Sequence, residues 1–443
     1  PLNENAAKPM KVGISASGID LKKLQPFMVL FASFPQDMEI SGTAESDLLI
    51  SSEKDTYSFR TESTKIKKLK LLSPQQEPFF QEEVLFVFDG DYNPAEASWA
   101  IRELLLTGPD IKIKGDFEKS VDGNSTKLQG QADLEYSLAG VSEVFSQFLP
   151  EGLEMAGKTE HKIEFGAQYP TGQTNKLMAN LNGKANLGFE KAGYMGLDFG
   201  PTEVDIQVEK GLMKIAPFST TVNNGQLNFA ANADFNQQPT LLETPGPIEI
   251  IKDIQINDRT TKQLLMYVNP IFANAVNVSG IANFACEKLA IPLAGVNNKE
   301  IEVIGTISVN QLRLQASDLL GEIFSLIGAA STGGQSITIQ PTRFVLRDGF
   351  LQYDDMQMDI GDNPVNFKGV IGLDKSLNMT VTLPYTLKGG TVRVYEKTAG
   401  ERISLSLKGN LDKPELDTGK LLEDVLEKEV KTQLKKVLED LFK

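Results

Sequence analysis

The stretch Ile111-Lys-Ile-Lys-Gly115-Asp-Phe117 alternates apolar and charged residues at every second position. Successive side chains of a β-strand point to opposite faces of a sheet. This stretch therefore places Ile111, Ile113 and Phe117 on one face and charged side chains on the other. The same alternation recurs at residues 204–208, 227–235, 365–371 and 379–383. Such half-apolar strands are typical of antiparallel sheets with one covered and one wet face.

Three stretches that end in a glycine mark an internal repeat. Gly42, Gly157 and Gly280 each follow a short apolar helix-like segment, a break and a strand-like segment, and they lie 115 and 123 residues apart. A repeat at a fixed period is the signature of a modular architecture. We therefore expect three β repeats, each opened by a short helix, at residues 1–138, 139–259 and 260–400. The third repeat is longer and carries a helical insertion near 317–330, and residues 401–443 add final strands and a helix.

The fold class expected from these patterns is mainly β. Three repeats of antiparallel strands would form an elongated curled sheet or groove, and tandem β-sandwich domains are the alternative. Residues 418–443 predict an amphipathic C-terminal helix, because their apolar residues follow i, i+3, i+4 spacing. We expect this helix to pack on the end of the sheet or on a partner protein.

Composition excludes several classes of function. The formal net charge is −15, which opposes binding to nucleic acid. A single histidine and a single cysteine rule out an internal disulfide and a multi-histidine metal site within one chain. No nucleotide-binding glycine loop, CxxC or GxSxG motif occurs. We therefore expect no catalytic residues, no metal and no cofactor, and a chain that is not an enzyme.

Four local features have structural interpretations. His161 is expected on a strand face shared with Ile163, as a satisfied, partly buried side chain, and Cys286 as a buried thiol. The segment 89–100 begins like a calcium loop, but lacks the turn glycine and the final acid, and is expected to be a hairpin turn. The lysines of segment 65–70 are expected on the open face of a strand, where they protect a sheet edge.

Several stretches together resemble the repeats of AsmA-like proteins. They are Ile40-Ser-Gly42, Val278-Ser-Gly280, the run from Phe344 to Tyr353, the run Asn366-Phe-Lys-Gly369-Val-Ile-Gly-Leu373, and Ile403-Ser-Leu-Ser-Leu407-Lys-Gly409 followed by Pro414 and a helix. The resemblance implies membership of the repeating β-groove superfamily that also holds TamB-like proteins. It implies a curled sheet that offers an apolar trough to acyl chains in the periplasm or envelope of a double-membraned bacterium. It also implies an anchor in the inner membrane, which we expect upstream of the given residues.

The leading hypothesis is a non-enzymatic protein that binds or transfers a phospholipid or other acyl lipid, with further envelope proteins contacted through the C-terminal helix. A structural or adhesive cell-surface repeat protein is the alternative, and a carboxylate-based glycan-acting enzyme is a third possibility. The alternating apolar residues are the candidate lining of the groove: Ile111, Ile113, Phe117, Val204, Ile206, Leu227, Phe229, Val365, Phe367 and Ile371.

Overall fold

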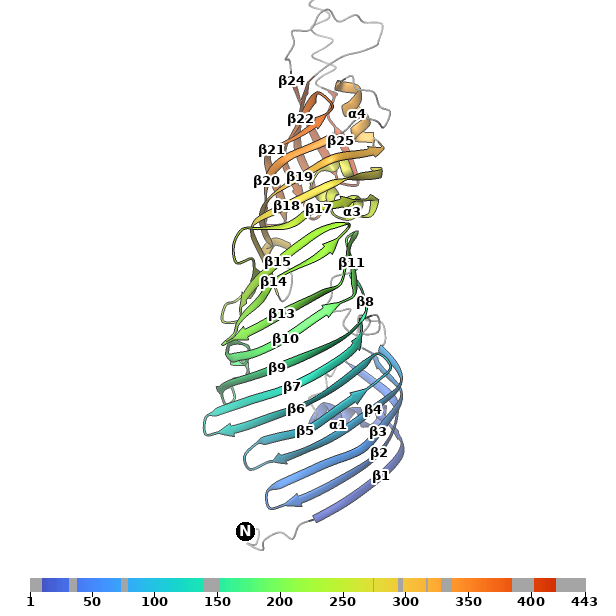
Figure 1. Cartoon of the computed structure of the whole chain (residues 1–443), viewed down its shortest axis with the longest axis vertical. Coiled ribbons are helices and arrows are strands. Elements are labelled where there is room, and N and C mark those ends of the chain that lie inside the picture. The colour runs from blue at the N-terminus through green and yellow to red at the C-terminus, as the bar shows by residue number, and fades with distance from the viewer. Residues whose placement is uncertain are drawn as a thin grey trace, which may run out of the picture. The chain divides into compact units, whose positions relative to one another are not determined.

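The computed structural model describes residues 10–31, 38–72, 79–138, 152–273, 275–293, 298–315, 318–327, 337–384 and 402–419. Over these residues, twenty-five strands belong to one antiparallel sheet (Figure 1). The predicted mainly β fold with a curled antiparallel sheet is confirmed. Contacts divide the chain into two compact units. Unit 1 comprises residues 1–194, 198–221 and 228–245, and unit 2 comprises 195–197, 222–227 and 246–443.

Unit 1 is a meander in which each strand pairs with the next in the order β1 to β7, then β9, β10, β13 and β14. Short strands β8 and β11 form a separate pair. The strands of unit 1 are β1 (Met10–Asp20), β2 (Glu39–Glu53), β3 (Thr56–Leu72), β4 (Phe79–Asn93), β5 (Ser98–Thr107), β6 (Ile111–Asp122), β7 (Ser125–Ser137), β8 (Glu154–Ala156), β9 (Lys158–Pro170), β10 (Leu181–Phe189), β11 (Lys191–Tyr194), β13 (Thr202–Glu209), β14 (Leu212–Val222) and β16 (Leu241–Glu243).

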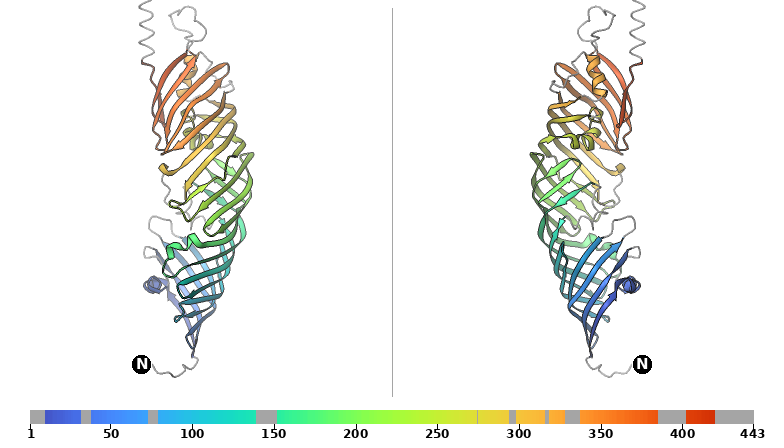
Figure 2. Two further views of the ribbon diagram at one scale, coloured as in Figure 1. Left: turned by 90° about the vertical axis from the view of Figure 1, so that its left-hand side faces the viewer. Right: turned by 90° about the vertical axis from the view of Figure 1, so that its right-hand side faces the viewer.

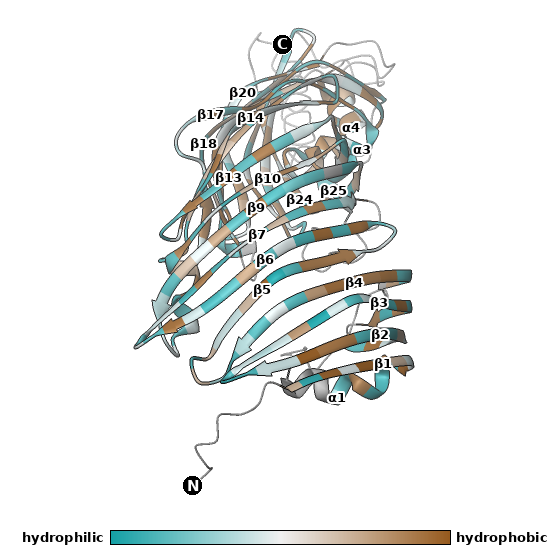
Figure 3. Ribbon diagram, turned by 60° about the horizontal axis from the view of Figure 1, so that its bottom comes forward, coloured by the Kyte–Doolittle hydropathy of each residue, from teal (hydrophilic) through white to brown (hydrophobic). Residues whose placement is uncertain are grey.

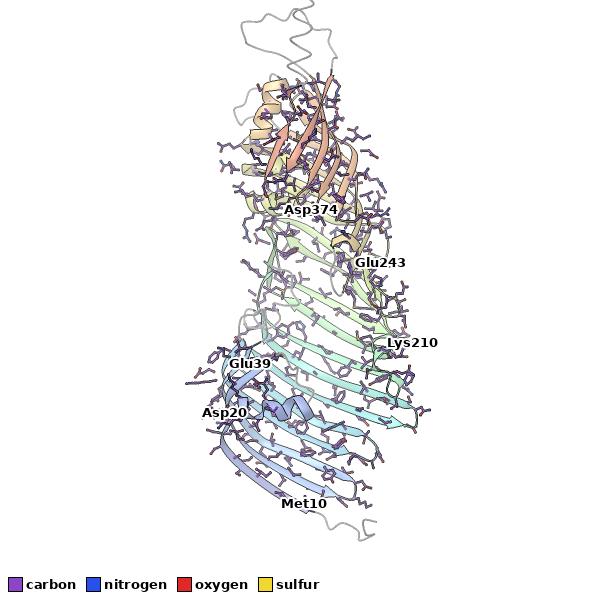
Figure 4. All side chains as sticks on the ribbon, turned by 180° about the vertical axis from the view of Figure 1, so that it is seen from behind. Met10, Asp20, Glu39, Lys210, Glu243 and Asp374 are labelled. Atoms are coloured by element: carbon purple, nitrogen blue, oxygen red, sulfur yellow. The ribbon has the colours of Figure 1, made fainter. Side chains whose placement is uncertain are left out.

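Helix α1 (Leu21–Phe31) lies on one side of the sheet of unit 1 (Figures 1 and 2). Seen from behind, it crosses in front of the strands between Asp20, which precedes it, and Glu39, which begins β2 (Figure 4). Leu21 is buried in a cluster with Ile40, Ala44 and residues of β3 to β5. The sheet curls around this side, so α1 lies against its inner face.

Glycines with a positive φ close two of the hairpins. Strands β6 and β7 close at Asp122 and Ser125, and Gly123 between them has φ +53°. A positive φ at this place suits the tight turns that match the right-handed twist of the strands, and glycine adopts it without steric cost. Strands β21 and β22 close in the same way around Gly361, with φ +56°. Both turns consist of Gly, Asn and Asp residues, which favour tight turns of this kind.

Unit 2 is also a meander, running from β17 to β25 with each strand paired to the next. Strands β12 (Leu197–Phe199) and β15 (Gly225–Asp234) carry residues of both units. The strands of unit 2 are β17 (Ile248–Ile256), β18 (Val276–Pro292), β19 (Glu302–Gln315), β20 (Ile337–Arg347), β21 (Phe350–Ile360), β22 (Asn363–Gly372), β23 (Leu377–Pro384), β24 (Arg402–Asn410) and β25 (Lys413–Leu416).

Helices cover the apolar sheet face of unit 2. Helix α4 (Asp318–Ile327) buries its apolar side chains and contacts β23 and β25 (Figure 1). Helix α3 (Asp258–Gln263) is capped by Asn257, whose side chain accepts a hydrogen bond from the Thr260 amide at 3.0 Å. The 3₁₀ turns that follow, η4 (Leu265–Tyr267) and η5 (Pro270–Phe272), are buried as well. Three more 3₁₀ turns are η2 (Thr174–Lys176), η3 (Met178–Asn180) and η6 (Asn298–Glu300).

Helical segments precede the strands that carry Gly42 and Gly280, namely α1 and the α3–η5 stretch. The segment expected to open the second repeat, and the expected C-terminal helix from residue 420 onward, lie outside the described residues. The three-repeat boundaries stay a prediction. Among the described residues, no helix has the length and apolarity needed to cross a membrane.

Candidate functional site: an apolar sheet face in unit 1

One apolar row of residues crosses eleven strands of unit 1 without a polar side chain. Directly paired residues in an antiparallel sheet point to the same face, so their register defines that row. From β1 to β14 the row is Val12, Ile50, Phe59, Gly90, Ile101, Phe117, Gly130, Phe165, Gly183, Val208 and Met213.

A second row runs beside the first on the same face, and Thr61 is its one polar member. It consists of Ile14, Leu48, Thr61, Phe88, Leu104, Gly115, Ala132, Ile163, Ala185, Ile206 and Ile215. Strands lie about 4.8 Å apart, so the two rows form a band roughly 48 Å long. We call this band the inner face, because α1 lies on the same side. Apolar segments along β2 to β5 are visible as brown ribbon in Figure 3.

The inner face is only half buried. Most members of the two rows are partly exposed, and the end members Val12 and Ile14 are 39% and 45% exposed. In unit 2, by contrast, Val365, Phe367 and Val381 are each 0% exposed. The same alternating pattern therefore gives buried apolar side chains in unit 2 and partly exposed ones in unit 1. Unit 2 packs its apolar face under helices, whereas the described residues of unit 1 keep hydrocarbon partly exposed along a continuous band.

Aromatic rings and glycines interlock along the inner face. The Phe117 and Phe165 rings stack with their centroids 6.2 Å apart, on either side of Gly130 in the same row. A Cβ at Gly130 would lie 2.9 Å from the Phe165 ring and 2.8 Å from the Asp116 carbonyl oxygen. The missing side chain at Gly130 therefore leaves room for the Phe165 ring to lie over β7, so the surface between the two rings stays apolar.

The opposite face of unit 1 is charged and internally paired. Lys112 of β6 contacts Glu135 of β7 at 3.1 Å, and Gln131 donates to Asp116 at 2.7 Å. Such cross-strand pairs stabilise the sheet modestly and keep this face wet. It holds open depressions, one of about 520 Å³ beside Asp116, Gln131, Glu164 and Lys184. The charges of both signs make these depressions unsuitable for hydrocarbon.

The structure distributes the predicted lining residues as follows. Ile111, Ile113 and Phe117 of β6 and Val204 and Ile206 of β13 are half buried. They pair with apolar or aromatic partners such as Tyr136, Leu134 and Leu187.

The remaining predicted residues lie elsewhere in the sheet. Phe229 of β15 packs edge-on against Phe218 at 6.0 Å, and Leu227 pairs with Ile251 of β17. Val365, Phe367 and Ile371 of β22 are buried in the core of unit 2. The predicted set is therefore divided between the two units. Their assignment as lipid ligands stays a prediction.

The calcium-like segment is a strand followed by a turn, as expected. Asp89 and Asp91 lie on β4, and the Arg102 guanidinium of β5 bonds both carboxylates. The hydrogen bond from Arg102 lowers the pKa of the Asp91 carboxyl. The turn begins at Asn93, whose side-chain oxygen accepts from the Ala95 amide at 3.0 Å. The acids are thus bound by arginine.

The structure also tests the interpretations of the lysine segment and of Cys286. Lys65 to Lys70 lie on β3, which pairs with β2 on one side and β4 on the other, so their expected role at a sheet edge is wrong. Cys286 is buried in β18, as predicted. Among the described residues, the edge of unit 1 is β1, a strand with exposed apolar residues that sequence reasoning did not single out.

His161 lies buried on β9, on the face shared with Ile163, as predicted. Its Nδ1 atom is hydrogen-bonded to Asn186 at 3.2 Å, but its Nε2 atom is buried and has no hydrogen-bond partner in the described part of the chain. The expected full satisfaction of this side chain is therefore wrong. Sequence alone carries no signal for this, because it depends on which side chains the neighbouring strand β10 places beside His161.

Comparison with known proteins gave no match: no protein-family model, no curated protein and no solved structure corresponds to this chain.

Proposed function

We propose that the chain is a non-enzymatic lipid-binding protein that holds acyl chains along the inner face of unit 1. The observation that carries the proposal is the pair of apolar rows across eleven strands, which stay half exposed where unit 2 covers its own apolar face. Contiguous exposed apolar surface of this kind marks an interaction site in a folded protein.

The dimensions of the inner face support acyl chains as the occupant. One leaflet of a bilayer holds hydrocarbon to a depth of about 15 Å, half of the roughly 30 Å core. The band of about 48 Å therefore offers room for several chains end to end. Each methylene removed from water contributes about 0.8 kcal/mol, so even a partly buried chain would bind with useful affinity.

A role in lipid transfer within a bacterial envelope is the wider form of this proposal. It rests on the resemblance to AsmA-like and TamB-like repeats, whose curled sheets are expected to present such a trough. Partner proteins contacted through residues beyond 419 belong to the same proposal.

Native mass spectrometry with lipid extraction tests the proposal on the full chain. We expect acyl lipids to co-purify with the wild-type protein. The variant Phe165→Asp, which places a charge on the inner face, should lose them. Its matched control Glu164→Lys changes charge on the neighbouring residue of the opposite face and should retain them. A wild-type protein that never yields lipid after exposure to phospholipid vesicles would contradict the proposal.

A further inference from the structure

The margin of the inner face nearest α1 carries two buried polar side chains, His161 on β9 and Gln81 on β4. They are 7% and 5% exposed. Gln81 pairs with Leu69, a member of the apolar cluster under α1, and His161 pairs with Leu134. Among the described residues, the atoms His161 Nε2 and Gln81 Oε1 are buried side-chain atoms without a hydrogen-bond partner. Unsatisfied buried polar atoms are uncommon in folded proteins.

Two consecutive hydrogen bonds determine which nitrogen of the His161 ring carries the proton. Asn186 donates from Nδ2 to the Asp205 carboxylate at 2.7 Å. A carboxylate only accepts hydrogen bonds, so this contact orients the amide and turns Asn186 Oδ1 toward His161 Nδ1 at 3.2 Å. An amide oxygen also only accepts, so Nδ1 carries the proton. In the neutral ring, Nε2 is therefore a hydrogen-bond acceptor.

Gln81 is arranged by the same logic. Its Nε2 atom donates to the Asp110 carboxylate at 3.4 Å, which leaves Oε1 as the acceptor atom. Beside the other polar side chain, the Tyr136 ring lies 5.6 Å from the imidazole of His161. Both buried acceptors are therefore oriented by a carboxylate, Gln81 directly by Asp110 and His161 through Asn186 by Asp205.

The strand pairing changes at His161. The register between β9 and β10 extends to Ile163 and Ala185, and β9 continues beyond it paired with β7. The pairing resumes where Lys191 of β11 pairs with Ala156 of β8, so in the described part of the sheet His161 lies in a short break between two paired segments.

We propose that this margin binds the head of an amphiphile that carries an alcohol hydroxyl, with His161 Nε2 accepting the hydrogen bond while the hydrocarbon lies on the inner face. The inference rests on the proposed function, since the inner face must hold the chain. The inference adds that the head group of the bound amphiphile donates a hydrogen bond.

The test compares a long-chain 1-alkanol with its methyl ether of equal chain length, using the full chain and competition against a fluorescent acyl probe. The two ligands share their hydrocarbon and differ in the donor. A net hydrogen bond corresponds to roughly a two- to tenfold difference in affinity. We expect the alkanol to bind tighter by this factor. In His161→Phe, which keeps a ring beside Tyr136, we expect both ligands to bind with the affinity of the ether.

The single histidine of the chain allows a second readout that needs no variant. In protein labelled with ¹⁵N-histidine, we expect a protonated Nδ1 and an unprotonated Nε2, and an Nε2 resonance that shifts with the alkanol and not with the ether. A proton on Nε2 in the free protein would overturn the inference.

The outcomes separate the inference from the proposed function. Equal affinity of the wild-type protein for the alkanol and the ether overturns the inference alone. Tighter binding of the alkanol that persists in His161→Phe but disappears in Gln81→Met also overturns it, because the acceptor would then be Gln81. Failure of both ligands to bind overturns the proposed function and the inference together.

Discussion

Phe117 and Phe165 stack across Gly130 on the inner face of unit 1, with ring centroids 6.2 Å apart. The two phenylalanines lie on β6 and β9, and the glycine lies on the strand between them. This arrangement removes side-chain bulk between two rings and lets them form one surface. An acyl chain that crosses the strands would therefore contact a continuous aromatic surface from β6 to β9.

The glycine between the rings should not tolerate a methyl group. Gly130→Ala places a Cβ 2.8 Å from the Asp116 carbonyl oxygen, a backbone atom that cannot swing away. We expect a loss of about 1–3 kcal/mol in the free energy of unfolding, measured by urea denaturation. Gly166→Ala is the matched control, because its Cβ would approach nothing closer than 3.5 Å. Equal stability of the two variants would show that the stacked geometry is not required.

Charge on the inner face should affect lipid affinity more than stability. Ile206 is half buried on β13 and its neighbour Gln207 points to the wet face. We expect Ile206→Lys to weaken binding of a fluorescent acyl probe at least tenfold, because the ammonium would have to be desolvated against hydrocarbon. Gln207→Lys, with the same added charge, should bind as the wild type does. A similar loss in both variants would indicate an effect of net charge alone.

The two units should differ in their response to truncation of a phenylalanine. Phe367 is 0% exposed in unit 2, whereas Phe117 is half buried. We expect Phe367→Ala to cost about 3–5 kcal/mol of unfolding free energy and to leave acyl-probe binding unchanged. Phe117→Ala should cost clearly less stability and weaken binding. The contrary result, with binding lost only in Phe367→Ala, would move the lipid site to unit 2.

Acid should weaken the contact between Asp91 and Arg102. The hydrogen bond from Arg102 lowers the pKa of Asp91 in the folded protein. Its stabilisation is therefore complete above the unfolded value near 4 and is lost as the pH falls through the lower, folded value. Both side chains are partly exposed, so we expect an effect below about 1 kcal/mol. Asp91→Asn should flatten this part of the acid unfolding profile, whereas an unchanged profile would exclude the contact as a source of stability.

Much of the fold follows from alternation in the sequence. The face assignment of β6 and β13, the glycine turn at Gly123 and the helix at 318–327 are all predictable, because each depends on local periodicity or local backbone preference. The register is not local. The contact between Phe117 and Phe165 exists because β7 pairs with β9 and the short β8 pairs elsewhere. No residue pattern within a single strand encodes that choice.

The difference between the two apolar faces is also a tertiary property. The sequence around Ile113 and that around Phe367 alternate alike, and only the packing of α4 and η5 separates a core from an accessible surface. The free acceptor on His161 likewise depends on Asn186 and Asp205, which lie on other strands. Such features require the register and the helix positions to be known first.

Site-specific photocrosslinking shows on which face of unit 1 an acyl chain lies. A benzophenone amino acid is placed at Phe165 on the inner face, or at Glu164 on the wet face, and the full chain is irradiated with radiolabelled phospholipid vesicles. If acyl chains lie on the inner face, we expect a lipid adduct from position 165 and little or none from position 164. Adducts of equal yield at both positions, or an adduct from position 164 alone, would contradict it.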